Sequence, residues 1–138
     1  MLSLEFVVFG TPVSHQSHNK ARLRAWQQSV RDAAQAVWPE GQPPATGACL
    51  LIVVYFFGRF PANLDNDNLV KPIQDALNGL VYDDDRQVTD NVIRRTNIEV
   101  PFRFRAGKHS ALLMETLRSE TEFVYVRVED APSHEELL

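Results

Sequence analysis

The apolar run from Ala48 to Phe57 places the tightest limit on how this 138-residue chain can fold. The run is rich in Val, Ile, Tyr and Phe, which favour strands, and it is too short to cross a bilayer. A connector rich in proline and glycine (residues 39–47) precedes it, and Gly58 follows it. A strand that is apolar at every position needs cover on both faces. We therefore predict an inner strand that is buried on both sides of a sheet.

Periodicity and residue type predict the other elements around this strand. β-branched and aromatic residues predict three further strands, over residues 2–9, 88–100 and 123–128. Apolar residues three or four apart predict three helices, over residues 20–38, 69–80 and 110–118. Pro72 should sit near the start of the second helix or kink it. The order β-α-β-α-β-(α)-β predicts an α+β fold in which helices cover a mixed sheet.

Length and composition limit the classes of protein to which the chain can belong. A chain of 138 residues corresponds to one domain, which we assign to residues 1–130, with residues 131–138 as an acidic tail. The single cysteine, Cys49, excludes an internal disulfide and favours a reducing compartment. No apolar stretch reaches the ~18 residues that a membrane span needs. We expect a cytoplasmic protein without a membrane partner.

The charges are distributed unevenly along the chain, which has a formal net charge of −4. Residues 61–90 hold two basic and seven acidic side chains, a local charge of −5. Residues 91–108 hold five basic side chains and one acidic side chain, a local charge of +4. Such blocks matter more than the total, because each block can serve a different partner. The acidic block in the middle of the chain therefore needs an explanation of its own.

Four aspartates in that block have the pattern of a metal site. Asp65 and Asp67 follow the buried strand, and residues two apart on an extended backbone point the same way. Two such carboxylates repel each other unless a cation lies between them, and Mg²⁺ prefers oxygen ligands. Asp85, with Asp84 beside it, could supply a third carboxylate from a separate loop. We therefore expect a divalent cation at this place.

Lys71 stands four residues after Asp67 and four before Asp75, so a helix would put all three on one face. A lysine there could neutralise the carboxylates or contact a phosphate. This set of residues suits metal-assisted hydrolysis of a phosphodiester, in which the metal activates water and offsets charge on the phosphate.

Three simpler interpretations of the same residues exist. An Asp- and Asn-rich segment before a helix is often only a turn and an N-cap. The run from Asp83 to Asp85 could be a solvated turn. An EF-hand loop starting at Asn63 is excluded, because Asn68 and Gln74 stand where that loop needs Gly and Glu. The first two interpretations stay open on the residue pattern alone.

A family resemblance favours the catalytic interpretation. The segments DNDNLVKP (65–72), DALNG (75–79) and DDRQV (84–88), with Tyr82 between them, resemble the signature of the RusA family of Holliday junction resolvases. The resemblance is strong over residues 63–95. It implies a small α+β homodimer that cuts branched DNA with Mg²⁺, or with Mn²⁺ in its place. It also implies catalytic roles for Asp65, Asp67, Asp85 and Lys71, and metal binding by the three aspartates together with Asp84.

Basic side chains in several segments are candidates for DNA contact. The main candidates are Lys20, Arg22, Arg24, Arg59, Lys71, Arg86, Arg94 and Arg95. A later basic segment adds Arg103, Arg105 and Lys108, interleaved with Phe102 and Phe104. Its phenylalanines could stack on unpaired bases or belong to the core or a dimer interface. Apolar side chains offered for that interface are Trp26, Trp38, Phe102, Phe104 and Phe123.

Two rival functions remain on the sequence alone. Some family members carry several arginines just before the first aspartate, whereas this chain has only Arg59 there. That difference motivates a DNA-binding module without turnover. The second rival is an acidic, metal-stabilised structural protein of phage origin. Cleavage assays with and without Mg²⁺ separate the three hypotheses.

Overall fold

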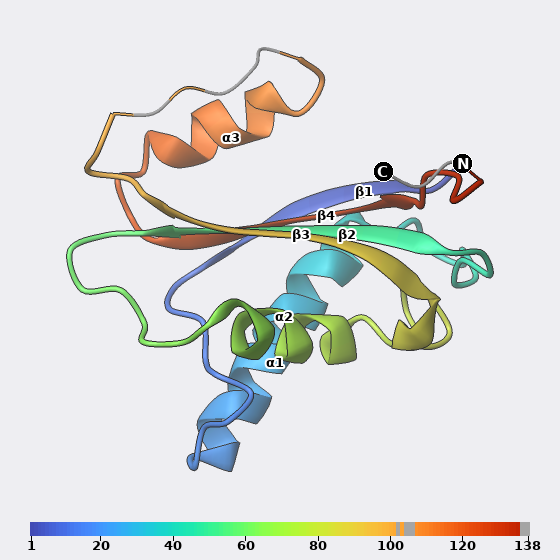
Figure 1. The fold of residues 1–138 in the computed structure, drawn as a ribbon, viewed down its shortest axis with the longest axis horizontal. Coiled ribbons are helices and arrows are strands. Elements are labelled where there is room, and N and C mark those ends of the chain that lie inside the picture. The colour runs from blue at the N-terminus through green and yellow to red at the C-terminus, as the bar shows by residue number, and fades with distance from the viewer. Residues whose placement is uncertain (102, 104–106, 136–138) are drawn as a thin grey trace.

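One four-stranded sheet with helices on both faces forms the protein (Figure 1). The computed structural model describes residues 1–101, 103 and 107–135. Its elements are β1 (Ser3–Phe9), α1 (Lys20–Val37), β2 (Cys49–Phe57), α2 (Asn66–Ala76), the 3₁₀ helix η1 (Asp85–Gln87), β3 (Val88–Asn97), α3 (Ser110–Leu117) and β4 (Phe123–Asp130). This order and the α+β class confirm the prediction from the sequence.

The sheet is mixed, with the strand order β1-β4-β2-β3. β4 pairs antiparallel with β1 and with β2, whereas β2 and β3 run parallel. β2 is an inner strand, as predicted, but only one of its faces is fully buried. Leu51, Val53 and Tyr55 are buried on the side of α1 and α2, while Leu50 and Ile52 are half-buried on the other side. The prediction of two buried faces is therefore wrong for the second face, which the short helix α3 covers only in part (Figure 1).

Helices α1 and α2 pack on the same face of the sheet and form the main core with it (Figure 1). The apolar stripe of α1 buries Leu23, Trp26, Val30 and Ala34. Trp38 and Phe123 are buried as well. Trp26, Trp38 and Phe123 therefore belong to the core of one chain and are not available for a dimer interface. Phe102 and Phe104 lie outside the described residues.

Arg31 of α1 fixes the C-terminal end of α2. Its Nη1 donates hydrogen bonds to the carbonyls of Ala76 at 3.0 Å and Asn78 at 2.8 Å. The last carbonyls of a helix have no partner within the helix, and the negative end of the helix dipole favours a cation there. Gly79, with φ of +76°, then turns the chain away.

Pro72 lies inside α2, because the helix begins at Asn66 and not at Leu69 as the periodicity predicts. A proline has no N–H to donate to the carbonyl four residues earlier. That carbonyl belongs to Asn68, and it accepts a hydrogen bond from the His15 N–H at 3.0 Å. The loop before α1 thus supplies the missing donor and is tied to α2.

The opposite face of the sheet holds a smaller cluster around Phe56, Phe123 and Tyr125, against which α3 packs. Cys49 is buried in the main core, and burial raises the pKa of its thiol, in keeping with a small hydrophobic side chain. Among the described residues, every helix falls short of the length and hydropathy that a membrane crossing requires.

Candidate active site

The loop that leads from β2 to α2 is held by the buried side chain of Tyr55. Its hydroxyl accepts a hydrogen bond from the Ala62 N–H at 2.9 Å and donates one to Oε1 of Glu122 at 2.6 Å. Burial, together with the Glu122 carboxylate, raises the pKa of Tyr55 well above its usual value. The hydroxyl therefore keeps its proton and its two bonds. This anchor fixes the backbone just before Asp65.

Asp65 and Asp67 lie at the N-terminal end of α2. Asp65 is the N-cap, and its Oδ1 accepts a hydrogen bond from the Asn68 N–H at 3.0 Å. Asp67 lies in the first turn, and both residues are exposed. The N-cap interpretation is thus correct for one oxygen of Asp65. It does not exclude metal binding, because an ionised carboxylate has a second oxygen with acceptor capacity of its own.

Lys71 joins α2 to the second acidic segment, which is the turn of residues 83–85. Its Nζ lies 2.8 Å from Oδ1 of Asp75 and 2.7 Å from Oδ2 of Asp85. These hydrogen bonds, first to Asp75 and then to Asp85, raise the pKa of Lys71 to about 12. Lys71 is therefore a cation throughout the neutral range. Because Asp67 is one turn before Lys71 on the same face of α2, the contact with Asp85 brings the two acidic segments to one side of the helix.

The turn that carries Asp84 and Asp85 is ordered by its own hydrogen bonds. Asp84 caps η1 and accepts hydrogen bonds from the Arg86 N–H at 2.8 Å and from Nε of Arg86 at 3.3 Å. The backbone N–H of Arg86 is the main cause of a lowered pKa at Asp84, which keeps this carboxyl ionised.

Gln87 pins the same turn to a distant part of the chain. Its Oε1 accepts hydrogen bonds from the N–H groups of Asp83 and Asp84, and its Nε2 donates to the carbonyls of Ala45 at 2.8 Å and Gly47 at 3.0 Å. A turn that was merely solvated would have no such long-range bonds. The structure therefore favours a built position for Asp85 over the solvated-turn interpretation.

The structure brings together some of the predicted site residues and not others. Lys71, Asp75 and Asp85 form one cluster, in which Asp75 is a member that the sequence pattern placed in the same row but not in the site. No ion pair or hydrogen bond joins Asp65 or Asp67 to Asp85 within the described ranges. Over the same ranges, no three acidic, histidine or cysteine side chains are grouped closely enough to hold a metal ion. The donors themselves are carboxylate oxygens, which suit a hard divalent cation.

A comparison with protein families decides the class to which this fold and acidic segment belong. The model of the family described as endodeoxyribonuclease RusA matches residues 9–104, which include the whole acidic segment. This chain belongs to the RusA endodeoxyribonuclease family. A comparison with curated proteins found no match. The family assignment confirms the resemblance seen in the sequence and identifies the chain as an endodeoxyribonuclease.

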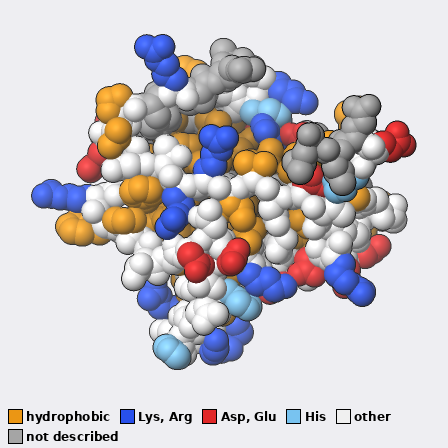
Figure 2. Space-filling view, viewed as in Figure 1, with side chains coloured by type: hydrophobic (Ala, Val, Ile, Leu, Met, Phe, Trp, Pro, Cys, Tyr) orange, Lys and Arg blue, Asp and Glu red, His pale blue; other side chains and the backbone are white. Residues whose placement is uncertain are grey.

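The basic side chains proposed for DNA contact in this RusA-family chain lie on several exposed segments. Lys20, Arg22 and Arg24 are exposed at the start of α1, and Figure 2 shows basic side chains at that end of the molecule, close to acidic ones. Arg59, Arg86, Arg94 and Arg95 are exposed as well, as are Arg103 and Lys108. Arg105 lies outside the described residues. The guanidinium carbon of Arg59 lies 5.9 Å from the centre of the exposed ring of Phe60.

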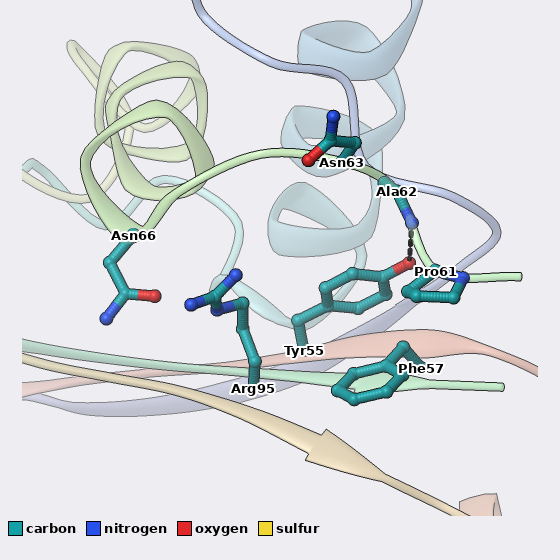
Figure 3. A pocket seen from close by; sticks show the side chains of 7 residues that line it. All are labelled: Tyr55, Phe57, Pro61, Ala62, Asn63, Asn66 and Arg95. Carbon is teal, nitrogen blue, oxygen red and sulfur yellow. Dashed lines mark hydrogen bonds between the residues drawn. The ribbon is translucent and has the colours of Figure 1, made fainter.

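A cavity of about 500 Å³ opens beside the N-terminal end of α2 (Figure 3). Its lining comes from β2, from the following loop, from the start of α2 and from β3, and consists of Tyr55, Phe57, Pro61, Ala62, Asn63, Asn66 and Arg95. The sequence pattern singled out Arg95 as a basic residue but did not indicate the cavity. Asn66 stands between two candidate metal ligands, and its neighbours alone gave no reason to single it out.

Proposed function

We propose that this member of the RusA family is a metal-dependent endodeoxyribonuclease that cuts Holliday junctions or related branched DNA. The observation that carries the proposal is the 2.7 Å contact between Lys71 and Asp85. It joins α2, which carries Asp67, to the turn that carries Asp84 and Asp85, and both lie inside the region that matches the family. A structural role alone gives no reason for so many carboxylates around one helix face.

The proposed roles follow from the chemistry of the side chains. Asp65, Asp67 and Asp85, with Asp84 beside them, would hold Mg²⁺, or Mn²⁺ in its place. A bound cation of this kind makes water a better nucleophile and offsets negative charge on the phosphate. The ammonium group of Lys71 has three N–H groups. Among the described residues, one of them donates a hydrogen bond to Asp75 and another to Asp85. The third could bond a phosphate oxygen of the DNA.

Three further features belong to the same proposal. The exposed basic residues named above would bind DNA phosphates. A homodimer would present two sites to the two strands that must be cut. We expect the protein to act in the cytoplasm, because its proposed DNA substrate is found there and because its single cysteine suits a reducing compartment.

A second candidate, a DNA-binding module without turnover, is favoured by one observation. Oδ2 of Asp85 is engaged by Lys71, so metal binding through that oxygen would require it to change partners. The two candidates make different predictions for the same experiment.

The test is a cleavage assay on a labelled synthetic four-way junction and on a linear duplex of the same sequence. Wild-type protein is compared in Mg²⁺, in Mn²⁺ and in excess EDTA, with binding measured in parallel by fluorescence anisotropy. We expect cleavage of the junction only with a metal. The variants D65N, D67N and D85N should each lose cleavage by more than about 100-fold, because each removes a ligand and not merely a neighbour of one.

Asp83→Asn is the matched control, because Asp83 lies in the same turn, is exposed and has no assigned role. It removes the same charge and should leave the cleavage rate within about twofold of wild type. Junction binding without cleavage in either metal would favour the DNA-binding module. Full activity in D85N would remove Asp85 from the catalytic set.

A further inference from the structure

One wall of the cavity beside α2 is aromatic. Phe57 is half-buried, and Tyr55 forms a fully buried floor that is fixed by Ala62 and Glu122. The centres of these two rings lie 5.8 Å apart with their planes tilted by 57°. A volume of about 500 Å³ falls within the ~300–1,000 Å³ of small-molecule sites. The cavity is therefore large enough for a flat ring.

Arg95 supplies hydrogen-bond donors on one side of this cavity. It pairs with Tyr55 in the parallel ladder between β2 and β3, so both side chains lie on the face that carries α2. Its Nη1 donates to the Leu64 carbonyl at 3.0 Å, and no salt bridge among the described residues includes it. A guanidinium has five N–H groups, so most of the donors of Arg95 are available to a ligand.

Asn66 supplies an acceptor on the other side. Its Oδ1 is buried and has no hydrogen-bond partner among the described residues. Buried polar atoms in proteins almost always have a partner, and one without a partner calls for an explanation. Figure 3 shows the side chains of Asn66 and Arg95 extending from α2 and β3 into the space between them. A ligand in that space would meet an acceptor and a cationic donor together.

This combination of groups matches a nucleobase better than a phosphate. A phosphodiester group of DNA only accepts hydrogen bonds, so it would satisfy Arg95 but place an anion against the unpartnered Oδ1 of Asn66. The edge of a nucleobase carries donors next to acceptors, and its flat ring suits an aromatic wall. Enzymes that take a base out of the helix bind it in this way, through its edge and through its faces.

We propose that this cavity binds one unpaired nucleobase of the DNA, and that Arg95 and Asn66 select which base enters. The proposal rests on the proposed nuclease function. Asn66 lies between Asp65 and Asp67, so a base held there would draw its own strand along the acidic segment. Cleavage would then depend on the base next to the cut, while basic residues elsewhere bind every sequence alike.

The first test measures base binding without cleavage and without a metal. ¹⁵N-labelled protein is titrated with the four deoxynucleoside monophosphates, and separately with deoxyribose 5-phosphate and with inorganic phosphate. We expect at least one nucleotide to shift the backbone amide of Ala62 and the side-chain amide of Asn66, with an affinity at least about 10-fold above that of deoxyribose 5-phosphate. Equal shifts with the two probes that lack a base would overturn the proposal in favour of a simple anion site.

Arg94 provides the matched control, because it is the same residue type one position earlier and lies on the opposite face of β3. Arg95→Ala should weaken nucleotide binding by about 10-fold or more, whereas Arg94→Ala should remove at most a phosphate contact and so affect the nucleotides and deoxyribose 5-phosphate equally. Asn66→Ala gives an independent variant if Arg95→Ala fails to fold. Equal effects of target and control variants would contradict the assignment.

The second test uses junctions that differ only in the base beside the scissile phosphate. Wild-type protein should cut the four junctions at different rates, and Arg95→Ala should reduce the ratio between the fastest and the slowest toward one. Arg94→Ala should keep that ratio, whatever its effect on the total rate. A ratio unchanged in Arg95→Ala would overturn the selection role. If wild type cut no junction, the nuclease proposal would fail while the nucleotide titration still decided base binding.

Discussion

At the scale of single residues, Lys71 links helix α2 to the turn that carries Asp85. It binds Asp75 within its own helix and Asp85 across the turn, at nearly equal distances. Without this cation, the two carboxylates would face each other with their repulsion uncompensated. The same ammonium is well placed to meet a phosphate, so its structural and proposed catalytic roles depend on one positive charge.

Replacing Lys71 by methionine tests both roles. The side chain of Lys71 is 41% exposed, so solvent screens its ion pairs, and we expect a loss of only about 1 kcal/mol or less in the free energy of unfolding. Cleavage should fall far more. Lys71→Arg is the control that keeps the charge, and it should keep most of the stability. Full cleavage by Lys71→Met would remove the residue from the proposed mechanism.

The pH dependence of that stability difference has a defined sign. The pKa of Lys71 is raised from 10.5 to about 12 in the folded protein, so its contribution is fully present below 10.5 and is lost as the pH rises through about 12. Urea unfolding of wild type and Lys71→Met should therefore give the same difference at pH 7 and pH 9. A difference that disappeared between these values would contradict the assigned charge state.

At the scale of elements, the turn before β3 depends on one side chain that reaches back across the chain. Gln87 is the residue that bonds Asp83 and Asp84 on one side and the carbonyls of Ala45 and Gly47 on the other. The position of Asp85 opposite Lys71 therefore depends on contacts made some forty residues earlier in the sequence.

Gln87→Ala should loosen this turn while leaving the sheet intact. The variant leaves partly buried backbone groups without a hydrogen-bond partner. We expect a loss of about 1–3 kcal/mol in the free energy of unfolding. Hydrogen exchange at the amides of Asp83 and Asp84 should become faster, and cleavage should fall with it. Arg86→Ala is the neighbouring control, because the Arg86 side chain is 90% exposed and its loss should change stability by less than about 0.5 kcal/mol. Unchanged exchange in Gln87→Ala would show that other contacts hold the turn.

The elements themselves were largely predictable from the sequence, because each one follows from local spacing and residue type. The start of α2 was not, since the periodic apolar residues begin at Leu69 whereas the helix begins at its Asp65 cap. The position of Pro72 inside the helix could not be predicted for a related reason. The hydrogen bond that compensates for its missing N–H comes from His15, in a distant loop. The spacing of residues along the chain does not indicate such distant hydrogen-bond partners.

The candidate site was predictable only where it follows one helix. The row formed by Asp67, Lys71 and Asp75 follows from a spacing of four residues, and the structure confirms the pair of Lys71 and Asp75. The contact with Asp85 requires the turn that Gln87 holds. The cavity requires the register that sets Arg95 beside Tyr55. Both depend on long-range pairing that spacing along the chain does not specify.

At the scale of the whole molecule, the acidic and the basic side chains of the candidate site lie on neighbouring elements. The acidic segment lies along α2, while exposed basic residues lie at the start of α1 and on β3. DNA bound along the basic residues would place its backbone beside the carboxylates, where a divalent cation would offset their mutual repulsion. A net charge of −4 is compatible with binding in this arrangement, since the contact region and not the total sets the local attraction.

The symmetry of the proposed substrate leads to the last prediction, which concerns assembly. A four-way junction is resolved by cuts in two opposed strands, and one chain of 15.7 kDa carries one candidate site. A two-fold dimer would supply two sites related by the same symmetry as the strands, and two-fold pairs are the commonest oligomers. A stable pair needs an interface of at least ~1,000 Å² in total. The apolar side chains available for it are exposed ones such as Phe9, Phe60 and Val92, because the tryptophans are buried within one chain. Light scattering at micromolar concentration should therefore report about 31 kDa, twice the mass of one chain. A monomer that still made paired cuts in one binding event would show that the symmetry of the junction does not require a symmetric enzyme.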